Sequence, residues 1–354
     1  MTNADHAGGI LTIDLDAIVA NWRTLKDRVA PAEVAAVVKA DAYGLGVGPV
    51  ARALLAAGCK SFFVSGVDEA RALRQMIAAT VFVLNPRAET DLAGAIPVLN
   101  SLDEIRAWPR TRPAALKIDT GMARRGLTAA DLDARGAEAL LRGLNLVLVM
   151  SHLACAELPD HPLNETQRAA FAAARGRFAN VRASLANSSG AFLPAAYHFD
   201  LIRAGAALYG VNPTPGRANP MRPAVQLLAR IVQVRDVDAG TTVGYGATHR
   251  FARPSRVATV AVGYADGYPR SLSNRGHGFI GGVRAPLVGR VSMDLASFDV
   301  TDVPAAQLPR DGFIELIGPH VSVDDVAEAA GTIGYEILTA LGRRYHRRYA
   351  GANG

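Results

Sequence analysis

The feature that most constrains this chain is a regular alternation, from Ile10 to about Tyr209, of short apolar runs with longer segments of helical period. Short apolar runs bounded by turn residues are typical of strands, and the alanine-rich segments between them have the spacing of amphipathic helices. This alternation predicts β/α units joined to a parallel sheet. The eight runs are AEVAAVVK (32–39), KSFFVSG (60–66), TVFVLNP (80–86), AIPVLNS (95–101), AALKIDT (114–120), LNLVLVMSH (144–152), VRASLANSS (181–189) and HFDLIRAG (198–205).

Eight such units in about 200 residues favour a closed eightfold β/α barrel, the TIM barrel, over an open doubly wound sheet. The next stretch, VNPTPGRANPMRP (211–223), has four prolines and cannot be a helix or a central strand. After it come β-branched runs separated by turn residues, with one expected helix at VDDVAEAAG (323–331). We therefore expect a barrel domain over 10–223 and a mostly β domain over 224–354. The segment GILTIDLDAI (9–18) could add a strand to either.

Composition excludes several classes of protein. Of the 354 residues, 50% are hydrophobic, and the net charge of +6 is spread along the chain, so we expect a folded protein and no nucleic-acid partner. The dense basic run RRYHRR (343–348) is expected to be a solvated end. Two cysteines build neither a disulfide framework nor a metal cage, so no metal is expected. Without an export signal or an apolar run of about 18 residues, we expect a cytoplasmic protein with no membrane contact.

Lys39 lies at a position in the sequence that is typical of a catalytic residue. It closes the first apolar run, and the active site of a β/α barrel is built at the carboxyl ends of its strands. A lysine desolvated there has a lowered pKa, so its neutral amine can attack a carbonyl and form a Schiff base. A strand-end lysine that only extends its amine to solvent has the same spacing, and the residues alone leave both interpretations open.

A series of motifs resembles the alanine racemases, which are pyridoxal-phosphate-dependent enzymes of fold type III. The motifs follow the order of that family over essentially the whole chain. They are VVKADAYGLG (37–46), KIDTGMARRG (117–126), SHLACAE (151–157), ANSSG (186–190), LIRAGAALYG (201–210), VGYADGY (262–268), GRVSMD (289–294) and GYEILTALG (334–342). The resemblance implies an N-terminal barrel that binds the cofactor and a C-terminal β domain that contributes to the active site of a partner subunit in a homodimer.

The resemblance also implies which residues hold pyridoxal phosphate. Lys39 would bind it covalently, and Arg203 would face its pyridine nitrogen with an always-charged donor that keeps this nitrogen unprotonated. His152 would join a hydrogen-bonded network near the ring. The phosphate would be held by Tyr43, Asn187, Ser188, the backbone amides of Gly205 and Ala206, and Tyr335. The residues alone favour an ordinary turn for NSSG and a structural ion pair for Arg203, and it is the resemblance, with the position of NSSG after the seventh strand, that reverses both interpretations.

Racemisation needs an acid/base group on each face of the substrate α-carbon. The resemblance assigns these roles to Lys39 and to Tyr264, the latter from the opposite subunit together with Met293. Met293 and Arg124 would hold the substrate carboxylate, and Lys117 would be carbamylated and orient Arg124.

This sequence departs from the family's usual residues in three places. Leu45 stands where His is usual, Ala123 where Gly is common, and Ser292 where Cys is frequent. The residues named for the chemistry are unaffected, although the local geometry around them need not be identical.

The function implied is the interconversion of L-alanine and D-alanine, which supplies D-alanine for peptidoglycan in the cell wall or serves D-alanine catabolism. One alternative is a racemase of another amino acid, or of a broad range, because a methyl difference changes binding by only about 1–3 kcal/mol. A non-catalytic pyridoxal-phosphate-binding protein resembles the barrel half alone. A decarboxylase of this fold would usually have an acidic partner where Arg203 stands.

Overall fold

The computed structural model describes residues 6–86, 91–178, 180–308 and 312–351. Its contacts divide the chain into two compact units. The barrel unit consists of Ile18–Leu208 and Asn212–Arg222. The β unit consists of the chain up to Ala17, Tyr209–Val211, and the chain from Pro223 onward.

The barrel unit contains eight strands, one in each of the eight apolar runs. They are β2 (Glu33–Val37), β3 (Ser61–Val64), β4 (Thr80–Val83), β5 (Ile96–Leu99), β6 (Pro113–Lys117), β7 (Asn145–Met150), β8 (Arg182–Ser184) and β9 (Leu201–Ala204). All neighbours are parallel, in the order β8-β7-β6-β5-β4-β3-β2-β9. Backbone bonds from Asp200 N to Ala183 O and from Arg203 N to Ala186 O, both 3.0 Å, connect β9 back to β8. The predicted eight-stranded barrel is confirmed.

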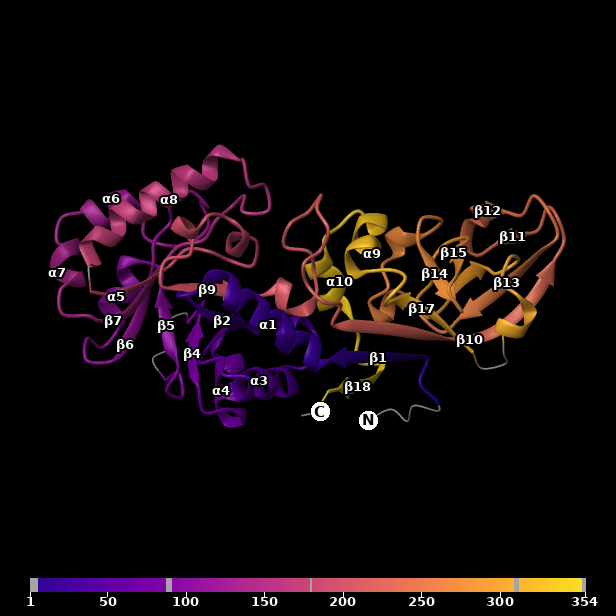
Figure 1. The fold of residues 1–354 in the computed structure, drawn as a ribbon, viewed down its shortest axis with the longest axis horizontal. Coiled ribbons are helices and arrows are strands. Elements are labelled where there is room, and N and C mark those ends of the chain that lie inside the picture. Colours follow the sequence, from indigo (N-terminus) through magenta and orange to yellow (C-terminus); the bar gives the residue numbers. More distant parts are fainter. Residues whose placement is uncertain (1–5, 87–90, 179, 309–311, 352–354) are drawn as a thin grey trace. The chain divides into compact units, whose positions relative to one another are not determined.

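Helices connect the strands and cover the barrel, and Figure 1 shows the strands lying between α6 and α8 on one side and α3 and α4 on the other. Local signals explain where they begin: Ser101 Oγ accepts a hydrogen bond from Glu104 N (3.1 Å) at the start of α5, and α8 has proline in its first turn. The helices are α1 (Leu15–Val29), α3 (Val47–Ala56), α4 (Val67–Met76), α5 (Leu102–Ala107), α6 (Ala129–Asp133), α7 (Ala137–Leu141) and α8 (Pro162–Arg175), with short 3-10 turns η1 (Gly176–Phe178), η2 (Ser189–Phe192), η3 (Ala195–Tyr197) and η4 (Ala206–Tyr209).

The β unit is built on a sheet of order β15-β14-β17-β10-β1-β18, with β13 and β16 joined beside β10 and a separate β11-β12 hairpin. Its strands are β1 (Gly9–Asp14), β10 (Val225–Val237), β11 (Thr242–Val243), β12 (His249–Arg250), β13 (Ser255–Val260), β14 (His277–Ile280), β15 (Val283–Pro286), β16 (Ala296–Asp299), β17 (Phe313–Ile317) and β18 (His346–Ala350). The remaining elements are α9 (Val323–Ala330), α10 (Gly334–Ala340), η5 (Tyr245–Ala247), η6 (Tyr264–Asp266), η7 (Arg270–Leu272) and η8 (Ala305–Gln307). The mostly β domain and its helix at α9 are confirmed.

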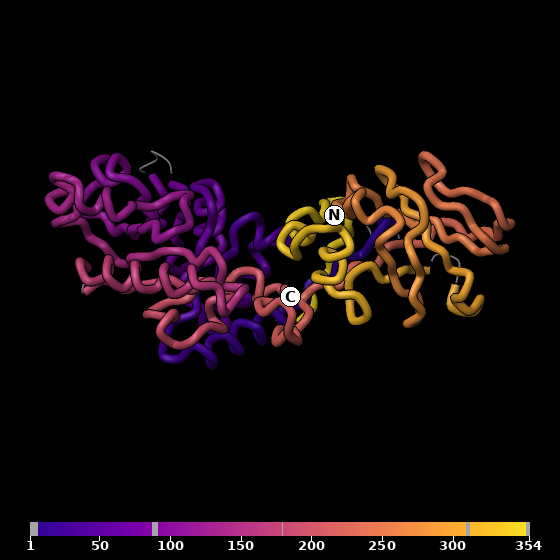
Figure 2. The backbone as a smooth tube through the Cα atoms, turned by 90° about the horizontal axis from the view of Figure 1, so that it is seen from above, coloured from indigo at the N-terminus to yellow at the C-terminus, as the bar shows by residue number. Residues whose placement is uncertain are grey.

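The structure answers two questions that the sequence left open or answered differently. The segment before the barrel, β1, pairs antiparallel with β10 and parallel with β18, and so belongs to the β unit (Figure 1, Figure 2). The basic run at 343–348 is not a loose solvated end, because its second half forms β18 and Tyr345 is buried. Within the described residues, no helix has both the length and the apolar character to cross a bilayer.

Candidate active site

The barrel brings several of the predicted site residues to the carboxyl ends of its strands. Lys39 follows β2, Lys117 is the last residue of β6, His152 follows β7, and Arg203 lies in β9. Because the strands are parallel, these ends meet at one face of the barrel, which is where barrel active sites are built. Residues separated by more than 160 positions of sequence therefore lie at the same face of the barrel.

The Lys39 amine is partly removed from water. Burial is the main cause that lowers its pKa, the positive charge of Arg124 lowers it further, and the carboxylate of Glu69 acts in the opposite direction. The neutral, nucleophilic amine is thus more populated at neutral pH than for a lysine in water.

The residues after Lys39 form a left-handed turn. Ala40, Asp41, Ala42 and Tyr43 have φ values of 52°, 54°, 54° and 56°, a conformation that costs roughly 1–2 kcal/mol for each residue with a side chain. Four such residues in succession persist only where surrounding contacts hold them. The turn directs the chain so that Tyr43 is buried.

Tyr43, Ser188 and Gly205 form a small cradle. A Cβ atom on Gly205 would lie 2.4 Å from the Tyr43 hydroxyl oxygen, so the phenol occupies the space that a side chain at 205 would need. Ser188 Oγ accepts hydrogen bonds from Gly205 N (2.9 Å) and Ala207 N (3.3 Å). Since both acceptor positions of Ser188 are used, its own proton is left to donate, which suits a phosphate oxygen.

Two other residues predicted to hold the phosphate lie in or near this cradle. Asn187 Oδ1 accepts from Gly190 N (2.9 Å), a contact inside the NSSG turn, and Ala206 is buried at the start of η4. Tyr335 belongs to the β unit, where it is the second residue of α10.

Arg203 is buried, with 4% of its surface exposed. Its guanidinium donates to Ser184 Oγ (2.5 Å), to Ser151 O (2.6 Å) and to Nδ1 of His152 (3.1 Å). Among the described residues no carboxylate is paired with it, so it is not a member of a structural ion pair. Burial lowers the pKa of Arg203 to about 9, which leaves it charged at neutral pH.

His152 is held as a neutral ring. Burial and the positive charges of Arg203 and Lys117 lower its pKa well below the ordinary value. Because Nδ1 accepts the hydrogen bond from Arg203, the ring proton lies on Nε2.

The loop that carries Arg124 is organised by Asp119. Its Oδ1 accepts from the amides of Gly121, Met122 and Ala123 at 2.9, 2.9 and 3.2 Å, and its Oδ2 accepts from Arg124 N at 3.1 Å. Although burial opposes ionisation, these amides keep the pKa of Asp119 below its usual range. Ala123 adopts φ 54° here, which explains why glycine suits this position.

Lys117 lies beside this loop in a positive environment. Burial, followed by the charges of Arg124 and Arg203, lowers its pKa to about 8. A substantial fraction of this amine is therefore neutral near pH 8 and able to react with an electrophile.

In the β unit, Tyr264 and Met293 lie on neighbouring turns. Tyr264 N donates to Ser292 O and Ala265 N to Met293 O, both at 3.0 Å. Gly263 permits this contact, because a Cβ there would lie 2.2 Å from Met293 O. Both side chains are presented to the outside of the chain, with 44% of Tyr264 and 54% of Met293 exposed.

A charged network that the sequence did not predict joins these two turns. Arg344 donates from Nε to Asp266 Oδ1 (2.6 Å) and from Nη1 to Asp294 Oδ1 (2.8 Å). Asp266 is buried and also accepts from Gly263 N at 2.9 Å. Arg344 lies inside a basic run, so nothing in the sequence distinguished it from the neighbouring arginines. The only available signal was the presence of its two acidic partners within one or two residues of predicted site residues.

Glu69 and Asp119 were likewise not predicted as site residues. Asp119 had a recognisable signal, since Asp two residues before Gly is typical of a turn in which the side chain caps backbone amides. Glu69 looked like an ordinary acidic residue in the first turn of a helix.

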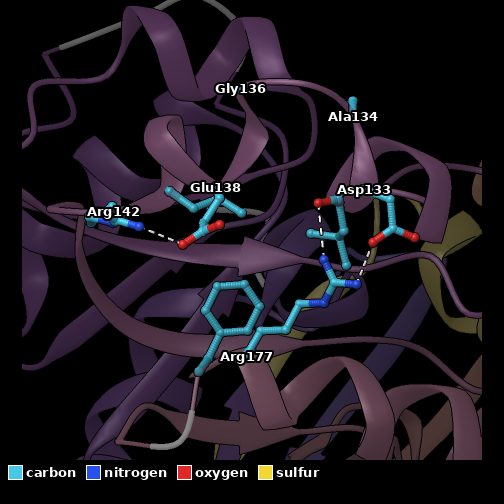
Figure 3. A pocket seen from close by; sticks show the side chains of 9 residues that line it. Asp133, Ala134, Gly136, Glu138, Arg142 and Arg177 are labelled. Carbon is cyan, nitrogen blue, oxygen red and sulfur yellow. Dashed lines mark hydrogen bonds and ion pairs between the residues drawn. The ribbon is translucent and has the colours of Figure 1, made fainter.

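A hollow of about 660 Å³ lies elsewhere on the barrel unit (Figure 3). It is lined by residues in and beside α6, α7 and η1. Since α7 precedes β7 and η1 precedes β8, the hollow lies toward the amino ends of these strands. Arg142 pairs with Glu138 (2.5 Å), and Arg177 pairs with Asp133 and donates to Leu132 O (3.0 Å). Its arginines are thus already neutralised, and none of the predicted residues lines it.

A β/α barrel that presents a desolvated lysine at a strand end, with hydroxyl and amide donors in a cradle beside it, belongs to the class of fold type III pyridoxal-phosphate-binding barrels. Two family models divide this chain between them: the alanine racemase N-terminal domain matches residues 13–213 and the alanine racemase C-terminal domain matches residues 224–349. The chain belongs to the alanine racemase family.

Individual relatives agree with this assignment. An alanine racemase of Rhodospirillum rubrum is 52% identical, covering 99% of this chain and 98% of the relative. A catabolic alanine racemase of Agrobacterium fabrum is 47% identical, and the match covers 98% of this chain and 93% of the relative. The crystal structure of alanine racemase from Bartonella henselae with covalently bound pyridoxal phosphate has a TM-score of 0.92 and 40% identity, covering 97% and 100%. That of the biosynthetic alanine racemase from Pseudomonas aeruginosa has a TM-score of 0.89 and 36% identity, covering 98% and 100%.

Proposed function

We propose that this protein is an alanine racemase, a pyridoxal-phosphate-dependent isomerase that interconverts L-alanine and D-alanine. The observation that carries the proposal is the position of Lys39, an amine of lowered pKa at the end of β2, in a barrel that also holds the cradle of Ser188, Gly205 and Tyr43. The similarity to alanine racemases over the whole chain supports it.

The residues present fit the cofactor. Lys39 would bind it covalently, Ser188 and Tyr43 with neighbouring amides would hold its phosphate, and Arg203 would donate to its pyridine nitrogen. When bound, pyridoxal phosphate withdraws electrons from the substrate α-carbon and so acidifies the hydrogen there. Arg203 has no acidic partner among the described residues and keeps its own proton, which favours simple return of a proton to the α-carbon over side reactions.

Two groups would exchange protons with the substrate. Lys39 Nζ would serve one face of the α-carbon, and Tyr264 Oη the other. We propose that Tyr264 and Met293 reach the site from a second copy of the chain, so that the C-terminal domain (224–354) completes the active site of its partner in a homodimer. Their exposure on the β unit is consistent with this role.

Arg124 would bind the substrate carboxylate, positioned by the amide contacts of Asp119. We further propose that Lys117 is carbamylated. Its pKa of about 8 provides the neutral amine that reacts with carbon dioxide, and the carboxylate formed would accept hydrogen bonds from Arg124.

The biological role would be supply of D-alanine for the cell wall or its catabolism, in the cytoplasm. Both descriptions occur among the relatives, since the Agrobacterium fabrum protein is catabolic and the Pseudomonas aeruginosa protein biosynthetic.

A coupled assay with each alanine enantiomer, with and without added pyridoxal phosphate, tests the proposal. Wild type should be active in both directions, and Lys39→Ala should be inactive. Tyr264→Phe should impair the two directions of α-hydrogen exchange unequally, whereas Tyr245→Phe, which changes another exposed tyrosine of the β unit, should not. Equal and full activity of Tyr264→Phe would reject the two-base assignment. Activity on serine or arginine above that on alanine would reject the substrate.

A further inference from the structure

Glu69 holds the start of the left-handed turn. Its Oε1 accepts a hydrogen bond from Ala40 N at 2.7 Å, and Ala40 is the residue directly after Lys39. Its Oε2 accepts from Ser65 N at 2.6 Å and from Gly66 N at 3.4 Å. One carboxylate therefore connects the segment after β2 to the segment after β3.

The far end of the same turn is held by its own chain. Gly44 N donates to Ala40 O at 2.7 Å, and Asp41 Oδ1 accepts from Val47 N at 2.7 Å at the start of α3. At the near end, where Lys39 leaves the strand, Ala42 N donates to Val38 O at 2.9 Å, and a side-chain contact to Ala40 N comes from Glu69 of α4. A carboxylate suits this position because it has two acceptor oxygens and the amides that donate to it lie on two different segments.

The charge of Glu69 also acts on Lys39. Its carboxylate raises the pKa of the Lys39 amine against the larger effect of burial. The hydrogen bond to Ala40 and the charge effect on Lys39 thus both connect Glu69 to the start of the turn.

We propose that Glu69 is a positioning residue: by holding the Ala40–Tyr43 turn in its left-handed form, it places the Lys39 amine for attachment of the cofactor and for proton exchange. This inference rests on the proposed function and adds to it a residue on the next β/α unit that no motif contained.

The test uses purified protein freed of cofactor, in wild-type form and as Glu69→Ala and Glu69→Gln. Each protein is reacted with pyridoxal phosphate over a range of pH and trapped with borohydride, and the labelled fraction at Lys39 is measured by peptide mass spectrometry. The matched control is Asp131→Asn, which changes an acidic residue at the equivalent position of α6, where it accepts from Thr128 N at 2.8 Å and contacts no part of the Lys39 turn.

Glu69→Ala should slow labelling of Lys39 by about tenfold or more, because a charge-assisted hydrogen bond to a strained segment is lost. Its pH profile should move to lower pH, because the negative charge that raises the amine pKa is gone. Glu69→Gln keeps one acceptor oxygen, so it should show the same pH shift with a smaller loss of rate. Asp131→Asn should match wild type in both the rate of Lys39 labelling and its pH profile.

Wild-type rate and wild-type pH profile in folded Glu69→Gln would overturn the inference while leaving the proposed function intact. If Glu69→Ala does not fold, Glu69→Gln carries the test alone. Absence of Lys39 labelling in wild type would overturn both the proposed function and the inference built on it.

Discussion

Nη2 of Arg203 donates a hydrogen bond across 3.1 Å to Nδ1 of His152. A guanidinium that is charged at neutral pH and a neutral imidazole are thus joined inside the barrel. Among the described residues, the other acceptors of the guanidinium are serine oxygens and backbone carbonyls, and none is a carboxylate. The arrangement therefore keeps a positive charge in place without a carboxylate to neutralise it.

Replacing Arg203 should be costly to the fold. Arg203→Leu leaves the buried acceptors Ser151 O and Ser184 Oγ without their donor, so the free energy of unfolding should fall by about 3 kcal/mol. Urea denaturation measures this. The exposed Arg235, whose contact is with Gln233, is the control, and Arg235→Leu should change stability by less than about 0.5 kcal/mol. Equal effects of the two substitutions would contradict the account of a buried network.

The cradle at Gly205 should tolerate no side chain. Gly205→Ala places a Cβ 2.4 Å from the Tyr43 hydroxyl, so the phenol must move, at a cost of about 1–3 kcal/mol and with weaker cofactor binding. In the double variant with Tyr43→Phe the closest atom is removed, and the next lies at 3.1 Å. Thermal or urea unfolding of all four proteins should therefore give a favourable coupling between the two substitutions. Strict additivity would show that the two residues do not share this space.

Lys117 should leave a signature in the pH dependence of stability. Its folded pKa is about 8 and its ordinary value is 10.5, so between these pH values the unfolded chain binds more protons than the folded one. This group therefore makes the free energy of unfolding rise from about pH 8 to pH 10.5. In protein kept free of carbon dioxide and bicarbonate, in which Lys117 is an unmodified amine, urea unfolding across this range should show the rise in the wild-type sequence and lose part of it in Lys117→Met. Lys60→Met, at an exposed lysine, should keep the rise. In protein prepared with bicarbonate, the proposed carbamylation should abolish this titration, and an intact-mass measurement before unfolding should show the added mass of carbon dioxide.

Arg344 should matter more than any other arginine of its basic run. Arg344→Leu leaves buried Asp266 without its cation and releases Asp294, so the turns of Tyr264 and Met293 should loosen. We expect a loss of about 1–3 kcal/mol in the free energy of unfolding and a fall in kcat. Arg343→Leu, one residue earlier, is the control. It should change the free energy of unfolding by no more than about 0.5 kcal/mol and kcat by no more than about twofold. Partial recovery of kcat in Arg344→Lys would show that positioning by charge, rather than packing, is involved.

Most of the architecture could be predicted because it is encoded locally. Each apolar run contained a strand of the barrel, and caps such as Ser101 marked where helices begin. The place of Lys39 at a strand end followed from the same pattern, because the carboxyl ends of parallel strands must share one face. The partner of the segment before the barrel could not be predicted, since its apolar alternation fits any sheet, and only the pairing of β1 with β10 and β18 assigned it.

The sequence by itself therefore determined the barrel, the mostly β second domain and the lysine that lies at a strand end, because these depend on periodicity and on residues close together in the chain. Only the tertiary structure decided that Glu69 holds the turn after Lys39, that Tyr43 fills the space above Gly205, and that Arg344 joins Asp266 to Asp294. The physical reason is that the identity of a charged or small residue does not reveal which residues it contacts. Its role is set by which partner the fold brings within about 3 Å, and that partner is distant in sequence.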